Sequence, residues 1–295
     1  MPYKAVRVLV DHEAQSVDKG TKVIKLPLSN VLHTLFVKAE AQTGSTGYTN
    51  AKVSDTIDKI EVIGNGSEVL VSLTPDLIKD LIKAKYDYEV RETVSSAANT
   101  WLESIYPIPF GHDFWDAGLW LPCNRFTDLE LRITYDLTKS GQDWASGTMT
   151  FTIVAYMTME GIPGGYAGTL RHTVVYDWST ASSGDETITM PRRLLWHGLL
   201  VQAIKAGATI RDIFSRVKLS INNDQIVPFN IKPDDYLDVT KKILMLDNAL
   251  WIDLKTWVDG GAFNPVRYDI VQLVLTQASE GAAAKVMLEE LLSIT

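Results

Sequence analysis

Short runs of alternating apolar and polar residues recur along the whole chain, and turn-forming residues separate them. A period of two is typical of β-strands that bury one face. The repeated short strands therefore predict an all-β fold, either a sandwich or a barrel. The runs of the first half are Val23–Leu28, Val31–Ala41, Ile57–Ile63, Val69–Leu73, Leu129–Leu137 and Met149–Met159.

Two local signals refine this prediction. Gly64-Asn65-Gly66 lies between two alternating runs and predicts a β-hairpin, because Asn and Gly both accept positive φ angles. Thr74-Pro75-Asp76 then predicts the start of a short helix, with Thr as N-cap and Pro at the first helical position. Segments rich in turn residues predict loops at Gln42–Asp55 and Tyr106–Asp113.

One segment of the chain recurs. Residues 27–39 read PLSNVLHTLFVKA and residues 191–203 read PRRLLWHGLLVQA, at a constant offset of 164. Pro27, His33 and Leu35 align with a proline, a histidine and a leucine in the second copy. A period this long exceeds that of a solenoid repeat and instead indicates two tandem copies of one domain.

The second half repeats the order of the first. A second short helix is predicted from Pro233-Asp234, which aligns with Pro75-Asp76. The tail Val286–Ile294 has a helical composition when taken alone, but the repeat places it opposite Met149–Met159 and predicts a closing strand. The other predicted strands of this half are Glu186–Met190, Leu194–Lys205, Val217–Ile221, Ile226–Ile231 and Ile270–Leu275.

These patterns give a domain plan. Residues 1–19 are predicted to form an N-terminal arm, although their one alternating run can also form an edge strand. Residues 20–160 form the first domain and residues 185–295 the second. Residues 161–184, rich in Gly and Ser, are predicted to be the connector, with Thr169–Trp178 as an ordered strand inside it.

Composition narrows the class of protein. The chain has 295 residues, of which 46% are hydrophobic and 22% charged, as expected for a globular protein with a substantial core. A net charge of −8 argues against a surface devoted to nucleic acid. Cys123 is the single cysteine and excludes internal disulfides. No secretion signal or membrane-spanning apolar run is visible, so we expect a soluble protein assembled in a cytoplasm.

The five histidines are His12, His33, His112, His172 and His197. None lies in a spacing that supplies two metal ligands from one element. His33 and His197 occupy equivalent positions in the two copies, but no partner ligands repeat with them. We therefore interpret both as packed, hydrogen-bonded core residues and predict no metal site.

Acids and tryptophans gather in one part of the first half, which leaves two interpretations. Paired carboxylates among tryptophans are compatible with a sugar-binding or glycosidase cleft. A large aromatic loop cluster that buries surface against another domain or subunit explains the same residues, and we favour this second interpretation. The residues concerned are Glu103, Asp113, Asp116, Trp101, Trp115 and Trp120.

Other catalytic or binding motifs fail on sequence context. Gly64-Asn65-Gly66 and Gly164-Gly165 lack the GK[ST] sequence and the long helix of a phosphate loop. No GxSxG nucleophile elbow occurs. The basic residues Lys4, Arg7 and Arg192-Arg193 are too sparse for a nucleic-acid footprint. We therefore predict no catalytic residue, no cofactor and no sequence-specific nucleic-acid partner, and we do not expect an enzyme.

The chain resembles the double jelly-roll major capsid proteins of tailless icosahedral DNA viruses, the lineage of adenovirus and membrane-containing phages. The resemblance covers residues 20–295. It implies two tandem eight-stranded jelly-roll β-sandwich domains with short flanking helices. The segments that carry it are the repeated Pro-led strand pair, DTIDKIEVIGNGSEVLVSLTPDLIKDL, FSRVKLSINNDQIVPFNIKPDDYLD and PFGHDFWDAGLWLPCNRFTDLELRITY.

The resemblance implies a structural role in the virion. Three chains would form a pseudo-hexagonal capsomer of six barrels, which contacts neighbouring capsomers and minor capsid or penton proteins. Loops around Gln42–Asp55, Tyr106–Leu121 and Ala249–Pro265 would form towers or subunit contacts. The N-terminal arm would lie at the base, where Lys4 and Arg7 could meet an internal viral membrane. The alternative is a two-domain jelly-roll carbohydrate-binding protein or glycan hydrolase, monomeric and with an aromatic groove.

Overall fold

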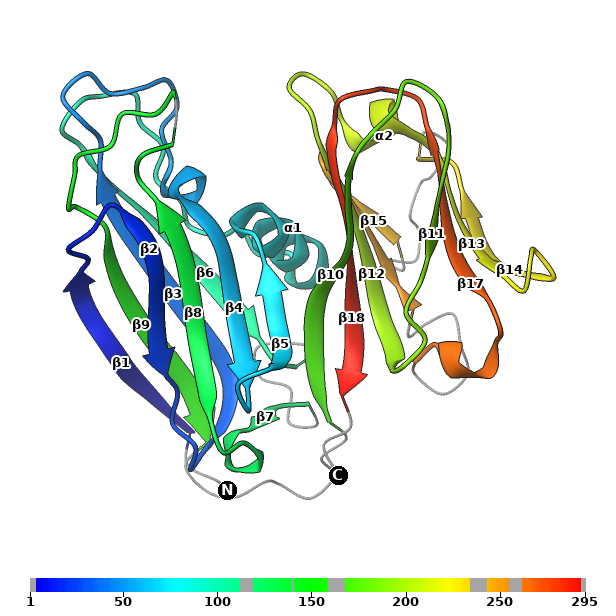
Figure 1. Ribbon diagram of the computed structural model, residues 1–295, viewed down its shortest axis with the longest axis horizontal. Helices are drawn as coiled ribbons and strands as arrows, with labels where there is room; N and C mark the ends of the chain where they lie inside the picture. Colours follow the sequence, from blue (N-terminus) through cyan, green and yellow to red (C-terminus); the bar gives the residue numbers. More distant parts are fainter. Residues whose placement is uncertain are drawn as a thin grey trace. The chain divides into compact units, whose positions relative to one another are not determined.

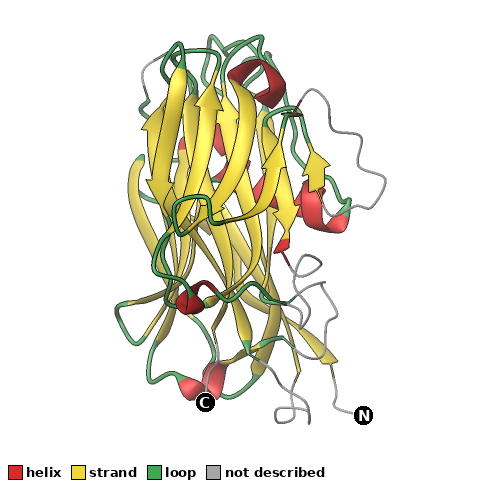
Figure 2. Cartoon of the chain, turned by 90° about the vertical axis from the view of Figure 1, so that its right-hand side faces the viewer, coloured by secondary structure: helices red, strands yellow, loops and turns green. Residues whose placement is uncertain are grey.

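The computed structural model describes residues 4–111, 119–139, 141–158, 168–233, 243–254 and 262–292. The chain divides into two compact units, and the boundary falls between Leu170 and Arg171 (Figure 1). Strands make up most of the described chain, and the helices are short segments between them (Figure 2). In the described part, no helix is both long and apolar enough to cross a membrane.

The first unit is a sandwich of two antiparallel sheets. One sheet has the order β1-β9-β3-β6, with the short β7 beside β3, and the other has the order β2-β8-β4-β5. Its strands are β1 (Lys4–Ala14), β2 (Lys19–Lys25), β3 (Val31–Gln42), β4 (Ile57–Gly64), β5 (Glu68–Leu73), β6 (Trp101–Pro109), β7 (Leu121–Pro122), β8 (Leu129–Asp136) and β9 (Thr150–Thr158). Its helices are η1 (Val53–Thr56), α1 (Pro75–Tyr86) and η2 (Cys123–Arg125).

The second unit has the same construction. One sheet has the order β15-β16-β12-β18-β10, and the other has the order β11-β17-β13-β14. Its strands are β10 (Thr169–Ser179), β11 (Gly184–Thr189), β12 (Leu195–Ile204), β13 (Phe214–Ile221), β14 (Ile226–Ile231), β15 (Ile243–Met245), β16 (Ala249–Asp253), β17 (Val271–Gln277) and β18 (Ala283–Leu292). Its described helices are α2 (Ile210–Ile213) and η5 (Pro265–Arg267).

The two units share one topology. If β10, β11, β12, β13, β14, β16, β17 and β18 take the places of β1, β2, β3, β4, β5, β6, β8 and β9, the sheet orders coincide. β3 begins at Val31 and β12 at Leu195, which are 164 residues apart, the offset of the sequence repeat. The repeated segment is therefore the third strand of each sandwich. The tail forms strand β18, as the repeat predicts. The composition of the tail, taken alone, would instead have indicated a helix.

Two predicted boundaries need correction. Residues 1–19 are not a separate arm, because Lys4–Ala14 form β1, which pairs antiparallel with β9 at the edge of the first sheet. The predicted connector, residues 161–184, contains Thr169–Ser179, which is β10, the first strand of the second sandwich. Both errors have one cause, because each sandwich begins two strands before the segment whose repeat is visible in the sequence.

The predicted loop at Tyr106–Asp113 is also wrong in its first half. Residues 101–109 form β6, paired with β3 so that Phe36 lies opposite Pro107 and Thr34 opposite Pro109. Proline cannot donate to a ladder, so it is tolerated in sheets mainly on edge strands. β6 is the edge strand of its sheet. The prolines that suggested a loop instead mark the sheet edge.

The local signals for the hairpins and the helix are confirmed. Asn65 and Gly66 have φ angles of 50° and 75° at the β4–β5 turn. The hydroxyl of Thr74 accepts a hydrogen bond from the Leu77 backbone N–H at 3.4 Å and caps α1. The apolar face of α1 is buried and packs against β4 and β6. The second predicted helix, from Pro233-Asp234, lies almost entirely outside the described residues.

Apolar side chains of the inner faces fill both sandwiches, as the alternation predicts. In β9, Phe151, Ile153 and Ala155 are buried while the residues between them are partly exposed. In the second unit, Trp196 and Phe263 lie with ring centroids 5.1 Å apart inside a core to which every strand from β11 to β14 contributes. The single thiol, Cys123, is buried, and burial raises its pKa to about 12, so it remains protonated and unreactive.

Candidate interaction surface

The histidines do not form a reaction centre among the described residues. No group of three or more His, Cys, Asp or Glu side chains there could hold a metal ion. His33 and His197 are buried at the third position of β3 and β12. His33 Nε2 lies 2.5 Å from Thr158 Oγ1, and its ring lies 4.0 Å from that of Trp120. His12 is exposed, with Nδ1 3.2 Å from a Glu40 carboxylate oxygen, and His112 lies outside the described residues.

One buried ionisable pair has no signal in the sequence. His172 Nε2 on β10 lies 2.9 Å from Glu289 Oε2 on β18, and both side chains are 1% exposed. On the opposite face of the same two strands, Arg171 Nε lies 3.7 Å from Glu290. Burial raises the pKa of Glu290, and the charge of Arg171 offsets this only in part. Residues 117 apart in sequence cannot be paired by spacing, so only the fold shows this contact.

The acids and tryptophans of the first unit do not form a cleft among the described residues. Trp101 lies opposite Gln42 at one end of β3, whereas Trp120 contacts His33 at the other end. Nine residues of strand place them about 30 Å apart. Glu103 is engaged by Lys38 at 2.9 Å and Arg91 at 2.6 Å. Asp113, Trp115 and Asp116 lie outside the described residues.

At one end of the first unit, an extensive network of hydrogen bonds joins a set of loops. The set consists of residues 43–56, 87–100, 137–139 and 141–149, and we call it the loop crown. The loops are hydrogen-bonded to one another through their backbones. Gly44 N donates to Asp143 O at 2.7 Å, Asn99 N donates to Gly44 O at 3.0 Å, and Ala51 N donates to Ser95 O at 2.8 Å. The crown is therefore a single joined structure.

Asp143 is the main side-chain anchor of the crown. Its Oδ2 accepts hydrogen bonds from Thr46 Oγ1 at 2.5 Å, Thr46 N at 2.8 Å and Gly47 N at 3.0 Å. These bonds, the Thr46 hydroxyl first, hold the pKa of Asp143 below its usual value. Gly44 lies so close that an added Cβ would be 2.0 Å from Asp143 Oδ1. Only glycine permits this approach.

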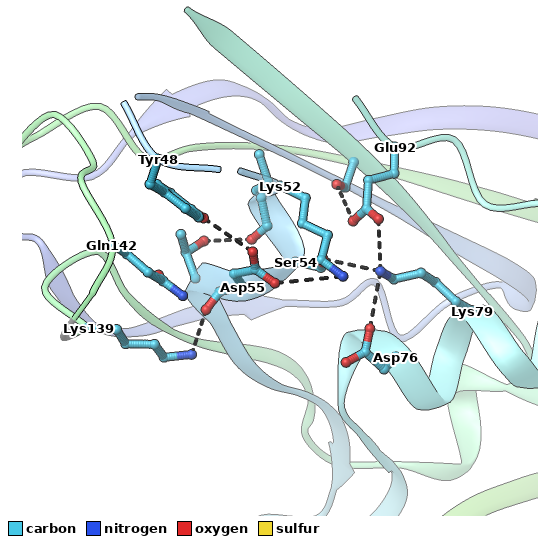
Figure 3. Close-up of polar contacts among 12 residues, drawn as sticks. Tyr48, Lys52, Ser54, Asp55, Asp76, Lys79, Glu92, Lys139 and Gln142 are labelled. Atoms are coloured by element: carbon cyan, nitrogen blue, oxygen red, sulfur yellow. Dashed lines mark hydrogen bonds and ion pairs between the residues drawn. The ribbon is translucent and has the colours of Figure 1, made fainter. Parts of the chain in front are cut away.

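A network of polar side chains joins the crown to α1 and to the sandwich of the first unit (Figure 3). Tyr48 donates a hydrogen bond to Asp55 Oδ2 at 3.2 Å, and Lys139 Nζ donates to the backbone O of Asp55 at 2.7 Å. Burial raises the pKa of both Tyr48 and Asp55. Lys52 Nζ is 3.8 Å from the Asp55 carboxylate and compensates its charge only weakly.

Lys79 is the centre of the second part of this network. From α1, its Nζ reaches Glu92 at 2.9 Å, Asp76 at 3.1 Å and the hydroxyl of Ser54 at 3.1 Å. Burial alone would lower the pKa of Lys79, but the hydrogen bond to Glu92 and the charge of Asp76 outweigh burial and raise it. One cation thus joins the helix to two crown loops, and the arrangement fixes loop shape without presenting a reactive group.

The crown corresponds only partly to the loops predicted as contact regions. Gln42–Asp55 lies in it. Tyr106–Leu121 does not, because its described part is β6 and the strand start that pairs with Val31–Leu32 at the other end of the roll. Ala249–Pro265 begins as β16, paired with β12. The loop at 137–149 contains Gly141 and Gly147, each preceded by a serine and therefore typical of turns, but neither this loop nor the one at 87–100 was predicted as a contact region.

Two antiparallel sandwiches with one strand order, repeated in a single chain, define a double jelly roll. By sequence, no protein-family model and no curated protein matches the chain.

Solved structures do match it. The STIV MCP is 13% identical over 98% of this chain and 96% of its own, with a TM-score of 0.71. The PBCV-1 virus capsid structure is 12% identical over 98% and 94%, with a TM-score of 0.69. The major capsid protein of bacteriophage PM2 is 14% identical over 99% and 98%, with a TM-score of 0.66. The predicted double jelly-roll fold is thereby confirmed, and the chain has the fold of these major capsid proteins.

Proposed function

We propose that this chain is a viral major capsid protein, a structural subunit of an icosahedral shell. The observation that carries the proposal is the full-length match of both rolls, in order, to capsid proteins of STIV, PBCV-1 and PM2. A shared fold does not fix function by itself. The described side chains support the same conclusion, because their polar clusters serve to hold loops and strands in place.

The subunit acts as a homotrimer. Each chain supplies two similar rolls, so three chains supply six and give a capsomer of nearly hexagonal outline. Such a capsomer tiles a hexagonal lattice while the two rolls remain free to differ in sequence. Neighbouring capsomers and minor capsid or penton proteins are the further partners. In this proposal, the protein is located in the virion, which is assembled in the host cytoplasm.

The two ends of the first roll have different roles in this proposal. The crown, with its braced loops, faces outward or towards neighbouring subunits. The opposite end, where β1 begins opposite Thr158, faces the particle interior. An internal membrane would meet the protein there, near Lys4 and Arg7. Loss of binding to anionic vesicles in the Lys4→Glu/Arg7→Glu variant tests this contact, and unchanged flotation would count against it.

Electron microscopy of the purified chain tests the proposed function directly. We expect negatively stained particles whose class averages show a compact, nearly hexagonal outline with three-fold symmetry. At high concentration, we expect these particles to associate into flat hexagonal arrays or shells. Isolated two-lobed particles at every concentration would contradict the capsid assignment and would favour the monomeric carbohydrate-binding alternative.

A further inference from the structure

The edge strands of the two rolls differ in how much apolar surface they expose. β1 carries Val6 and Val8, which are 68% and 53% exposed, and β14 carries Ile226 and Val227, which are 46% and 39% exposed. Their equivalents in the other roll are β10 and β5. Neither of those strands, both fully described, has a large hydrophobic side chain that is exposed. The first-strand position therefore exposes large apolar side chains only in the first roll, and the fifth-strand position exposes them only in the second roll.

The open position on the first roll is a continuous apolar face. Val6 lies opposite Tyr156 and Val8 opposite Val154, and Val154 in turn lies opposite Phe36 on β3. Paired residues project from the same side of a sheet. The residues between them on β9 are buried in the core, so these side chains lie on the outer face. β1 is at the free edge of this sheet (Figure 1, dark blue).

The open position on the second roll is the β14 edge. β14 pairs only with β13 in its sheet, and it contains Pro228 between its two exposed apolar residues and Phe229 (Figure 1, yellow). β1 for its part has register shifts between Val8 and Val10 and between Val10 and Glu13. Bulges and prolines prevent continuous pairing of strand edges. A partner of either strand would therefore pack by side chains.

We propose that the β1 face of one copy of this chain packs against the β14 edge of the next copy. The inference rests on the proposed trimer and names the surfaces that close it. The partner is a second copy because the chain exposes apolar side chains at one first-strand position and one fifth-strand position, while its other first and fifth strands, β10 and β5, expose none. A monomer would leave four exposed apolar side chains on these two edges, whereas the pairing buries them together.

This contact is heterologous, since it joins two different surfaces. Heterologous contacts repeat from copy to copy and either close into a ring or extend into a filament. With two rolls per chain, each contact places a first roll beside a second roll. In a ring that closes after three copies, first rolls and second rolls alternate, and this arrangement gives the nearly hexagonal outline of the proposed capsomer.

Light scattering after size exclusion tests the pairing with full-length variants. Val6→Glu/Val8→Glu alters the β1 face, and Ile226→Glu/Val227→Glu alters the β14 edge. Val23→Glu is the matched control, because Val23 is 46% exposed on β2, in the other sheet of the first roll. Circular dichroism checks that each variant is folded. We expect both double variants to be monomers at concentrations where the wild-type and control chains are trimers.

Mixing the two double variants sharpens the test. Each retains one intact surface, so an equimolar mixture should yield mixed dimers that stop at two copies. If both double variants keep the wild-type mass, or if the mixture forms no dimer, the β1–β14 pairing is wrong while the trimer stands. A monomeric wild-type chain would instead overturn the proposed function itself.

Discussion

At the scale of single residues, two of the buried histidines, His33 and His172, each have a defined polar partner. His172 has no metal-ligand spacing in the sequence, and the fold shows that Glu289 is its partner. His33 has its hydrogen bond with Thr158 and its aromatic contact with Trp120. The interpretation of His33 as a packed core residue agrees with this geometry, although neither partner could be identified from spacing.

The His172–Glu289 pair gives the first prediction. Glu289→Ala leaves a buried imidazole without its carboxylate partner, and an unsatisfied buried polar group costs about 1–3 kcal/mol. We expect the free energy of unfolding, measured with urea at neutral pH, to fall by that amount. Glu186→Ala is the control, because it removes the partly exposed partner of Tyr176 and should change the stability little. Equal losses in the two variants would contradict the account.

The turn after β8 gives a prediction of pH dependence. Asp136 accepts hydrogen bonds from Lys19 Nζ at 2.8 Å and from Thr138 Oγ1 at 2.7 Å and Thr138 N at 2.8 Å. These bonds, the one from Lys19 first, lower the pKa of Asp136 from 3.8 to about 2. Because the pKa of Asp136 is lower in the native state than in the unfolded state, the carboxylate stabilises the fold at pH values above the unfolded pKa. This stabilisation is lost as pH falls towards the native pKa.

We therefore expect Asp136→Asn to lower the free energy of unfolding by about 1 kcal/mol at pH 6. The difference from the wild-type chain should shrink as pH falls from 4 towards 2, because the unfolded chain then binds a proton at Asp136 while the native carboxylate, with its pKa of about 2, still resists protonation. Denaturation curves at several pH values measure it. A difference that stays constant down to pH 2 would show that Asp136 acts through shape and not through charge.

At the scale of elements, the sequence predicts strands better than it predicts edges and loops. Alternation identified β3, β4, β5, β8 and β9 and most of their counterparts within a few residues, whereas β18 was identified from the repeat. It missed β6 because Pro107 and Pro109 are typical of loops, and only the sheet order reveals that they lie on an edge. The crown was missed for another reason. Its cohesion comes from backbone hydrogen bonds between residues 44 to 99 positions apart, which local composition cannot indicate.

The crown gives the element-scale prediction. Asp143→Ala removes the acceptor for Thr46 and Gly47, so the amides of residues 44–50 should open more readily. We expect hydrogen exchange in this segment to quicken by about tenfold or more, because three hydrogen bonds are lost and each contributes about 1 kcal/mol, while β3 and β9 keep their protection. Glu68→Ala, a partly exposed acid on β5, is the control. Unchanged exchange in the crown would show that backbone pairing alone holds the loops.

At the scale of the whole molecule, duplication explains both the success and the errors of the sequence analysis. The repeat at an offset of 164 marks the third strand of each roll, which is why two tandem domains could be predicted from it. The first strands, β1 and β10, lie outside the visible repeat. The chain therefore seemed to have an arm and a connector where the structure has strands. The fold class could be predicted from the alternation of apolar and polar residues, whereas the domain boundaries depend on strand pairing, which the sequence pattern does not show.

The proposed function also belongs to this scale, because it depends on what two rolls per chain allow. No described cluster of side chains points to catalysis, and the described tryptophans of the alternative carbohydrate site lie at opposite ends of β3. The capsomer that we propose, with six similar rolls from three chains, would make use of the duplication itself. The account therefore depends on self-association more than on any single residue.

The mass of the wild-type chain in solution tests this account most directly. Size-exclusion chromatography with light scattering at micromolar concentration should give a stable species of three times the chain mass of 32.8 kDa. The species should persist on dilution and in moderate salt, because apolar contacts hold it together. A single species of 32.8 kDa at every concentration would contradict the capsid account.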